Sequence, residues 1–159
     1  MSAVPQSPAA RLQPIRRMLP QDVREVVAIE KAEYPFPWTA GNFNDSLKSA
    51  YQAWIVRDEH EALAGYYLLM PAVDDAHLLN ITVRGDLHGH GVGRLLLEHM
   101  VSLSRRLRMD YVLLEVRPSN TRALKIYEQF GFERIGVRKG YYPAADNARE
   151  DAIVMRLIL

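Results

Sequence analysis

The chain contains, at residues 78–94, the stretch Leu78-Leu79-Asn80-Ile81-Thr82-Val83, a polar turn, and then Gly89-His90-Gly91-Val92-Gly93-Arg94. The first part is an apolar run that predicts a strand, and the periodic apolar residues after the glycines predict a helix. Glycines at the entry to a helix let the backbone approach a ligand closely. The amides of the helix start and the positive end of its dipole then favour a bound phosphate.

The spacing of these glycines excludes two well-defined phosphate-binding motifs. It is G-x-G-x-G, whereas the dinucleotide fingerprint is G-x-G-x-x-G, and no βαβ unit is predicted at the start of the chain. The P-loop does not fit either, because no Gly-Lys followed by Ser or Thr is present. On the glycines alone, a plain strand-to-helix turn explains the segment as well as a phosphate-binding loop does.

The first half of the chain is predicted to place two helices among short strands. Prolines in residues 34–38 separate the two helices, since each proline disfavours helix at the residue before it. Pro20 and Asp22 mark the start of the first helix, and Thr39 can cap the second. Strands are predicted at residues 12–17, 51–57, 62–70 and 76–83.

In the second half, one long helix precedes a buried strand and a shorter helix. Apolar residues at spacings of three and four bury one face of a helix that runs from Val92 to about Leu107. Residues 111–116 are a nearly unbroken apolar run, which is typical of a central strand. Asn120 can cap the helix that follows, and Gly131 can end it.

Two closing strands are predicted at residues 133–137 and 152–157, joined by a loop through Tyr141-Tyr142-Pro143. The predicted order of elements is then β-α-α-β-β-β-α-β-α-β-β. Runs of strands interleaved with single helices indicate a layered α/β or α+β domain built on a mixed sheet.

Length and composition narrow the function classes. A chain of 159 residues suits one domain, which we place at residues 12–159 after a flexible tail at residues 1–11. A net charge of +1 suggests neither a nucleic-acid partner nor attraction to a membrane. No cysteine is present, which excludes a thiol nucleophile and fits a reducing, cytoplasmic compartment. Neither a signal peptide nor an apolar window of about 18 residues is visible.

Residues 83–94 resemble the acetyl-CoA pyrophosphate loop of the GNAT acetyltransferase superfamily, whose core is Gln/Arg-x-x-Gly-x-Gly/Ala. This chain departs from the pattern at the first position, where it has His88. The backbone amides of the loop do not depend on that side chain. The resemblance implies that acetyl-CoA is the co-substrate and that these residues bind it: Ile81, Thr82, Val83, Gly89, His90, Gly91, Val92, Gly93, Arg94 and, further on, Asn120.

Two later stretches narrow the resemblance. Residues 114–120 and 123–132, Leu-Glu-Val-Arg-Pro-Ser-Asn and Ala-Leu-Lys-Ile-Tyr-Glu-Gln-Phe-Gly-Phe, look like the late GNAT motif. Tyr141-Tyr142-Pro143, residues 149–155 and Phe36-Pro37-Trp38 are similar to the RimI branch, whose enzymes acetylate the N-terminal alanine of small-subunit ribosomal protein number eighteen.

The resemblance extends from about residue 15 to residue 157. It implies a GNAT fold, with a mixed sheet of about six to seven strands, helices on both faces and a splayed strand pair that holds acetyl-CoA. The implied partner is the N-terminal peptide of a ribosomal protein.

The resemblance also assigns a general base and a general acid. The base falls on Glu115, the only charge inside the apolar run of residues 111–116; a carboxylate buried there would accept a proton more readily than an exposed one. From the residues alone, a Glu115 that points to solvent or pairs with an arginine at the end of a strand is the favoured alternative. The acid falls on Tyr127, which could also be an ordinary core tyrosine.

The substrate walls are predicted at residues 34–38 and 141–150, with Phe36, Trp38, Tyr141 and Tyr142 as contacts. Acidic groups accompany both segments, namely Glu33, Asp146 and Glu150, and would suit a basic peptide. Phe36 and Trp38 could alternatively be core residues under a broken helix.

The histidines suggest no metal site. His88-x-His90 has no third ligand nearby, and the reaction needs no metal. His60, His77 and His99 are scattered along the chain and are expected to have no special role.

Two alternative functions remain open at this stage. One is a GNAT enzyme that acetylates a protein lysine or a small amine. The other is a non-catalytic acyl-CoA-binding module.

Overall fold

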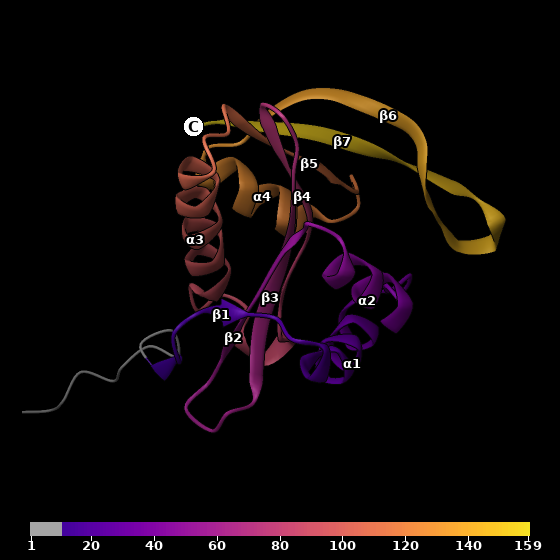
Figure 1. Ribbon diagram of the computed structural model, residues 1–159. Coiled ribbons are helices and arrows are strands. Elements are labelled where there is room, and N and C mark those ends of the chain that lie inside the picture. The colour runs from indigo at the N-terminus through magenta and orange to yellow at the C-terminus, as the bar shows by residue number, and fades with distance from the viewer. Residues whose placement is uncertain (1–10) are drawn as a thin grey trace, which may run out of the picture. The chain divides into compact units, whose positions relative to one another are not determined.

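The computed structural model describes residues 11–159, which form four α-helices, seven strands and three short 3-10 helices (Figure 1). The α-helices are α1 (Val23–Glu33), α2 (Ala40–Lys48), α3 (Val92–Arg106) and α4 (Thr121–Phe130). The strands are β1 (Arg16–Arg17), β2 (Gln52–Arg57), β3 (Leu63–Pro71), β4 (Asp75–Val83), β5 (Tyr111–Val116), β6 (Glu133–Pro143) and β7 (Arg149–Ile158). The 3-10 helices are η2 (Pro20–Asp22), η3 (Gly85–Leu87) and η4 (Ala145–Asn147).

The strands join in the hydrogen-bonded order β1-β2-β3-β4-β5-β7-β6. The sheet is mixed, because β4 and β5 run parallel while β5 and β7, among others, are antiparallel. The predicted fold class and element order are therefore confirmed. The predicted tail lies outside the described residues except for Arg11, and none of the described helices is long and apolar enough to span a membrane.

Three predicted strands, the first and the two closing ones, differ in extent from the structure. The first strand was predicted at residues 12–17 but has only two residues, with a separate bridge between Leu12 and Asp58. Pro14 explains the interruption, since proline has no N–H to donate to a ladder.

The closing strands are longer than predicted, and Tyr141-Tyr142-Pro143 lie within β6 instead of in a loop. Tyr142 pairs with Glu150 and Pro143 pairs with Arg149, so the turn shrinks to residues 144–148. Aromatic residues favour such extended backbone.

The described residues divide into two compact units. The first comprises the chain up to Leu69 together with Asn80–Met100, and the second comprises Met70–Leu79 and Val101–Leu159.

In the first unit, helices cover both faces of β3, as predicted. The Tyr66 hydroxyl donates to Glu30 of α1 at 2.9 Å. On the opposite face, Tyr67 Oη lies 2.6 Å from His99 Nδ1 of α3. Gly65 also faces α3, and a Cβ there would lie 2.8 Å from Thr82 O, so only glycine permits this close approach of β3 to β4.

Glu30 is buried in this unit and ties three segments together. Its carboxylate accepts hydrogen bonds from the Trp38 amide at 3.0 Å, the Tyr66 hydroxyl at 2.9 Å and Asn80 Nδ2 at 2.6 Å. A buried carboxylate needs such donors to offset its lost hydration. The three bonds fix the segment after α1 and the second half of β4 to the same point of α1.

A second buried carboxylate, Asp22, anchors the start of α1. Both its oxygens accept from the Arg16 guanidinium at 2.9 Å, and Arg57 Nη2 and the Leu19 amide add bonds at 2.8 and 2.7 Å. Burial disfavours ionisation, but the hydrogen bonds outweigh it and lower the pKa of Asp22 to about 2 from its ordinary 3.8.

In the second unit, β5 lies between β4 and β7. Its ladder with β4 covers three pairs, Asp75–His77 against Tyr111–Leu113, while its ladder with β7 covers all six residues. The sequence analysis expects β4 to splay away from β5. A ladder of only three residue pairs would allow the two strands to separate beyond it. Val112, Leu114 and Val116 are buried on one face of β5, which leaves Glu115 on the other face.

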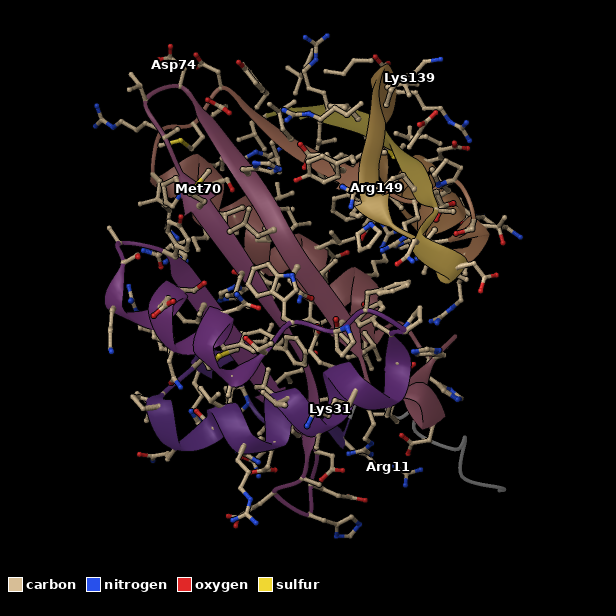
Figure 2. The ribbon with its side chains drawn as sticks, turned by 90° about the vertical axis from the view of Figure 1, so that its right-hand side faces the viewer. Arg11, Lys31, Met70, Asp74, Lys139 and Arg149 are labelled. Carbon is tan, nitrogen blue, oxygen red and sulfur yellow. The ribbon has the colours of Figure 1, made fainter. Side chains whose placement is uncertain are left out.

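The hairpin of β6 and β7 is long and curved (Figure 1). Its register shifts between Arg138 and Tyr142, where the regular ladder is interrupted. Arg149, labelled in Figure 2, donates to Gly140 O at 3.0 Å and Tyr141 O at 3.1 Å and so bonds the carbonyls of the interrupted stretch.

The lowered pKa of Asp22 gives a stability prediction. Asp22→Asn should lower the free energy of unfolding at pH 7 by about 3 kcal/mol, because it leaves two arginines without their carboxylate. The contribution of Asp22 is fully present above about pH 4 and is lost as pH falls through about 2. Urea unfolding at several pH values should therefore show the two proteins converging in acid. Asp45→Asn, at an exposed position of α2, is the matched control and should change the free energy of unfolding little. A difference between Asp22→Asn and the unchanged protein that stays constant down to pH 2 would contradict the assignment.

Candidate active site

The glycine loop of the first unit enters α3 with two residues in the left-handed region, Gly89 with φ +79° and Gly91 with φ +83°. A Cβ at either position would meet no atom within 4 Å, so backbone conformation and not crowding favours glycine there. The first i to i−4 bond of α3 runs from the Leu95 amide to Gly91 O. The amides of residues 92–94 precede that bond and form the helix start to which an anion can bind.

His88, which occupies the departing position of the loop pattern, is directed back into the fold. Its Nε2 lies 2.8 Å from Val83 O and 3.5 Å from Glu33 Oε2. The side chain therefore holds the loop against β4 and the end of α1. Arg94, the predicted cation of the loop, makes an exposed i,i+4 pair with Glu98 at 3.0 Å.

The second half of β4 carries the other predicted acetyl-CoA contacts. Thr82 is buried, and its hydroxyl lies 2.8 Å from Tyr34 Oη and donates to Asn80 Oδ1 at 2.9 Å. Tyr34 Oη also donates to Ile81 O at 3.3 Å. These bonds fix Ile81 and Thr82 from the side of α1. Contact of the backbone of residues 81–83 with acetyl-CoA stays a prediction.

Glu115 lies in the second unit with only 6% of its side chain exposed, so the predicted burial is confirmed. One carboxylate oxygen, Oε2, is hydrogen-bonded to His77 Nε2. The other, Oε1, lies 3.4 Å from Arg138 Nε, whose side chain is 56% exposed. The pairing with an arginine is thus present. His77 is a second and closer partner of the carboxylate, which the sequence analysis missed.

Tyr142 is the aromatic neighbour of this carboxylate. Burial, and secondarily the charge of Glu115, raises the pKa of the Tyr142 hydroxyl. Arg117 stacks on its ring, with Cζ 4.4 Å from the centroid, and donates to Pro143 O at 2.7 Å. These contacts hold the end of β6 over the end of β5.

Glu150 is engaged internally. Burial opposes its ionisation, but hydrogen bonds from the Ser119 hydroxyl and amide and from Arg117 outweigh that effect and lower its pKa. The distances are 2.9, 3.0 and 3.2 Å. Its charge is therefore shared with Arg117, which corrects the expectation that Glu150 offers a negative wall to a basic peptide.

Some of the remaining predicted residues make structural contacts, and for others the predicted contact with acetyl-CoA or substrate stays a prediction. Asn120 caps α4, accepting from the Ala123 amide at 3.2 Å, as predicted, while its contact with acetyl-CoA stays a prediction. Tyr127 is half-buried, with its ring 5.8 Å from that of Phe132. The Trp38 ring packs on the ring of buried Phe43, with the ring centroids 5.3 Å apart. This contact favours the alternative in which Trp38 is a core residue.

Phe36 and Tyr141 differ from Trp38 in being exposed, at 44% and 43%. Both can therefore contact a substrate, and that role stays a prediction. Among residues 11–159, no group of three or more acidic or histidine side chains is arranged to hold a metal ion.

His77 is the neighbour of Glu115 that sequence reasoning missed, because it was expected to have no special role. Two residues on separate strands meet only once the strands are in register, and here His77 stands opposite Leu113, two residues before Glu115 on the parallel strand. No local spacing encodes that meeting.

The fold and these residues define a class of protein. The chain belongs to the acetyltransferase (GNAT) family, whose model matches residues 23–132, and is an acetyl-CoA-dependent N-acetyltransferase.

Individual proteins resemble it over most of its length. The chain is 34% identical over 136 residues to the [ribosomal protein bS18]-alanine N-acetyltransferase of Escherichia coli K12, covering 86% of this chain and 90% of that one. It is 34% identical over 142 residues to a putative [ribosomal protein bS18]-alanine N-acetyltransferase of Bacillus subtilis 168, covering 89% and 92%.

A solved structure agrees with these similarities. The crystal structure of the ribosomal-protein-S18-alanine N-acetyltransferase from Escherichia coli matches with a TM-score of 0.83 and 32% identity, covering 91% of this chain and 92% of that one. The GNAT fold predicted from the sequence is confirmed.

The left-handed glycine at position 91 gives a binding prediction. In Gly91→Ala the alanine must adopt a conformation that costs about 1 kcal/mol, so we expect the Kd for CoA to rise about fivefold. Isothermal titration calorimetry would measure it. Gly136→Ala is the matched control, since that glycine also has no atom within 4 Å of a Cβ but lacks the positive φ. Equal affinities in the two variants would show that the loop conformation does not matter for binding.

Proposed function

We propose that this protein transfers the acetyl group of acetyl-CoA to the N-terminal alanine of ribosomal protein bS18, in the cytoplasm, with Glu115 as general base. Similarity of about 34% to two proteins named for that activity, over nearly the whole chain, supports the substrate. The burial of Glu115 beside a histidine is the observation that carries the chemical role.

The first step is loss of a proton from the amine. An N-terminal amine has a reference pKa of about 8, against about 10.4 for lysine, so part of it is already neutral at cytoplasmic pH. A carboxylate that is positioned but weakly basic is enough to take the remaining proton. Glu115 can serve this purpose for an α-amine more readily than for a lysine side chain.

The amine then attacks the thioester carbonyl directly, and no acyl-enzyme intermediate is needed. Backbone amides of residues 81–83 would stabilise the oxyanion, and the amides of residues 89–94 would bind the pyrophosphate. Tyr127 would donate a proton to the departing thiolate. Because a thiol titrates near 8.5, the thiolate is a tolerable leaving group, and the acid should matter less than the base.

The peptide would lie against exposed aromatic surface and acidic groups. Phe36 and Tyr141 offer the exposed rings, and the Tyr142 ring packs edge-on against that of Tyr141. Glu33 and Asp146 are the acidic groups left for a basic peptide once Glu150 is paired with Arg117.

A peptide panel tests the substrate. The protein is incubated with acetyl-CoA and a peptide that begins Ala-Arg and contains an internal lysine, and the added acetyl is located by mass spectrometry. We expect it on the α-amine. The matched peptide, blocked at its N-terminus, should stay unmodified. Acetylation of the lysine would support the alternative GNAT activity, and tight CoA binding without thiol release on any amine would support a binding module.

Replacing the base should separate chemistry from binding. We expect Glu115→Gln to lower kcat at least a hundredfold, on the order of the contribution of a general base, while the Kd for acetyl-CoA stays within about twofold. Glu133→Gln, at an exposed position of β6, is the matched control. Intact turnover in Glu115→Gln would show that the base lies elsewhere.

Removing the general acid should lower kcat less than removing the general base does. Tyr127→Phe removes the hydroxyl but keeps the ring against Phe132, so we expect kcat to fall only about tenfold, less than in Glu115→Gln. Steady-state kinetics with thiol detection would compare the two variants. A larger loss in Tyr127→Phe than in Glu115→Gln would reverse the ranking.

A further inference from the structure

Under the proposed function, one ligand contacts two separate backbone segments of the first unit. The thioester end of acetyl-CoA would meet the amides of residues 81–83, and its pyrophosphate would meet those of residues 89–94. Residues 84–88 join the two segments. A ligand that reaches both ends binds well only if this connection already holds them at one fixed spacing.

The start of the connection is fixed to β3. The Arg84 amide donates to Ala64 O at 2.8 Å, and the Arg84 guanidinium donates to Leu63 O at 2.9 Å. The Val83 carbonyl belongs to the same planar trans peptide as the Arg84 N–H and therefore points the opposite way, away from β3. The ladder that joins β4 to β5 covers only Asp75–His77 of β4 and does not reach this carbonyl.

His88 supplies a donor for the Val83 carbonyl. Its Nε2 lies 2.8 Å from Val83 O, and because a carbonyl oxygen can only accept, Nε2 carries the proton and donates it. Within the turn, the Leu87 amide donates to Arg84 O at 2.9 Å. The His88 amide donates to Gly85 O at 3.2 Å. The connection is thus a closed turn whose last side chain is bonded to the residue just before its start.

Glu33, the last residue of α1, packs against the same turn. Its Oε2 lies 3.5 Å from His88 Nε2, and its Oε1 would lie only 2.6 Å from a Cβ at Gly85. The carboxylate beside Nε2 favours the tautomer that carries its proton on this nitrogen. The contact with α1 therefore supports the bond from His88 to Val83 O.

The glycines after His88 depend on the residues at either end of the loop for their position. Gly89 and Gly91 both have a positive φ, and no atom lies within 4 Å of a Cβ built at either one. Glycine backbone is conformationally free unless its neighbours restrain it. His88 restrains the loop before these residues, and α3, whose first i to i−4 bond comes from the Leu95 amide, restrains it after them.

We propose that His88 is a positioning residue for acetyl-CoA, which holds the glycine loop at the required spacing from β4 through its bond to Val83 O. The side chain itself touches neither the acetyl group nor the pyrophosphate. The inference rests on the proposed function, since it takes residues 81–83 and 89–94 as the two contact segments. It also accounts for the departure from the loop pattern, because glutamine and arginine, usual at this position, share with histidine a side-chain N–H donor.

Variants with and without a donor test the bond. His88→Leu keeps a side chain of similar size but has no N–H, whereas His88→Gln has one. We expect the Kd for CoA, measured by isothermal titration calorimetry, to rise about tenfold in His88→Leu and to stay within about twofold in His88→Gln. His60→Leu, at a side chain that is 81% exposed, is the matched control. Equal Kd values in His88→Leu and His88→Gln would overturn the proposal. If His88→Leu fails to fold by circular dichroism, His88→Ala takes its place.

A shortened co-substrate adds a readout that a general loss of stability would not move. S-acetyl-N-acetylcysteamine has the thioester end of acetyl-CoA but no pyrophosphate, so its binding needs no fixed spacing. We expect His88→Leu to lower kcat/KM about tenfold for acetyl-CoA and less than twofold for the short thioester, with released thiol as the measured product. A loss of the same size with both co-substrates would show that His88 acts on the fold as a whole and not on the spacing.

The binding data separate failure of this inference from failure of the proposed function. If Gly91→Ala weakens CoA binding and His88→Leu does not, only the positioning role of His88 is wrong. If neither variant changes the Kd for CoA, the loop is not the binding segment, and that part of the proposed function is wrong as well. The role of Glu115 is tested independently, because its readout is kcat.

Discussion

The buried carboxylate of Glu30 is the interaction on which the first unit depends. It cannot be left without donors, since an unpaired charge in an apolar interior costs several kcal/mol. Its donors come from the segment after α1, from β3 and from β4. The chain at Trp38 and the chain at Asn80 are thereby fixed to one point, although they are 42 positions apart.

This constraint extends from Asn80 into the segment assigned to acetyl-CoA. Asn80 presents its amide nitrogen to Glu30 and its oxygen to the Thr82 hydroxyl. Thr82 in turn lies against Tyr34, which precedes the proline-rich break after α1. One polar chain therefore orients both the backbone of β4 and the start of the loop that carries Phe36.

In the second unit, the long hairpin of β6 and β7 has to be held in place with few buried contacts. Nearly all of β6 is exposed, so apolar packing does little to fix it. Charged side chains hold the hairpin instead. Arg117 stacks on the Tyr142 ring, and Glu150 joins Arg117 to the turn at Ser119. Exposed ion pairs are weak singly, but this one is partly buried, and both carboxylate oxygens of Glu150 also accept hydrogen bonds from Ser119, which strengthens it.

Local patterns predicted the helices of this protein well. Proline, threonine, asparagine and glycine at helix ends act within four residues, so Thr39, Asn120 and Gly131 could be assigned their caps from the sequence. The central strand at residues 111–116 was equally visible, because a buried strand is an apolar run. The family resemblance, carried by short motifs, supplied the mixed sheet of about six to seven strands.

What the sequence did not reveal depends on pairing between strands. The extent of β6 follows from its partner β7 and from a register shift, neither of which has a local signature. For the same reason His77 could not be assigned to Glu115, nor Glu30 to Asn80. His88 illustrates a related case: the sequence showed only that it departs from the loop pattern, while its partners, Val83 and Glu33, lie on β4 and α1.

The unequal partners of Glu115 bear on how a cationic substrate could reach it. The Arg138 side chain is more than half exposed and sits at 3.4 Å, so its ion pair contributes at most about 1 kcal/mol. The His77 bond is closer and better shielded. Under the proposed reaction, an arriving ammonium group would therefore displace Arg138 into solvent at little cost and take Oε1, while His77 keeps Oε2. A carboxylate held from one side by a strong partner and from the other by a weak one remains fixed in position and still open to its substrate.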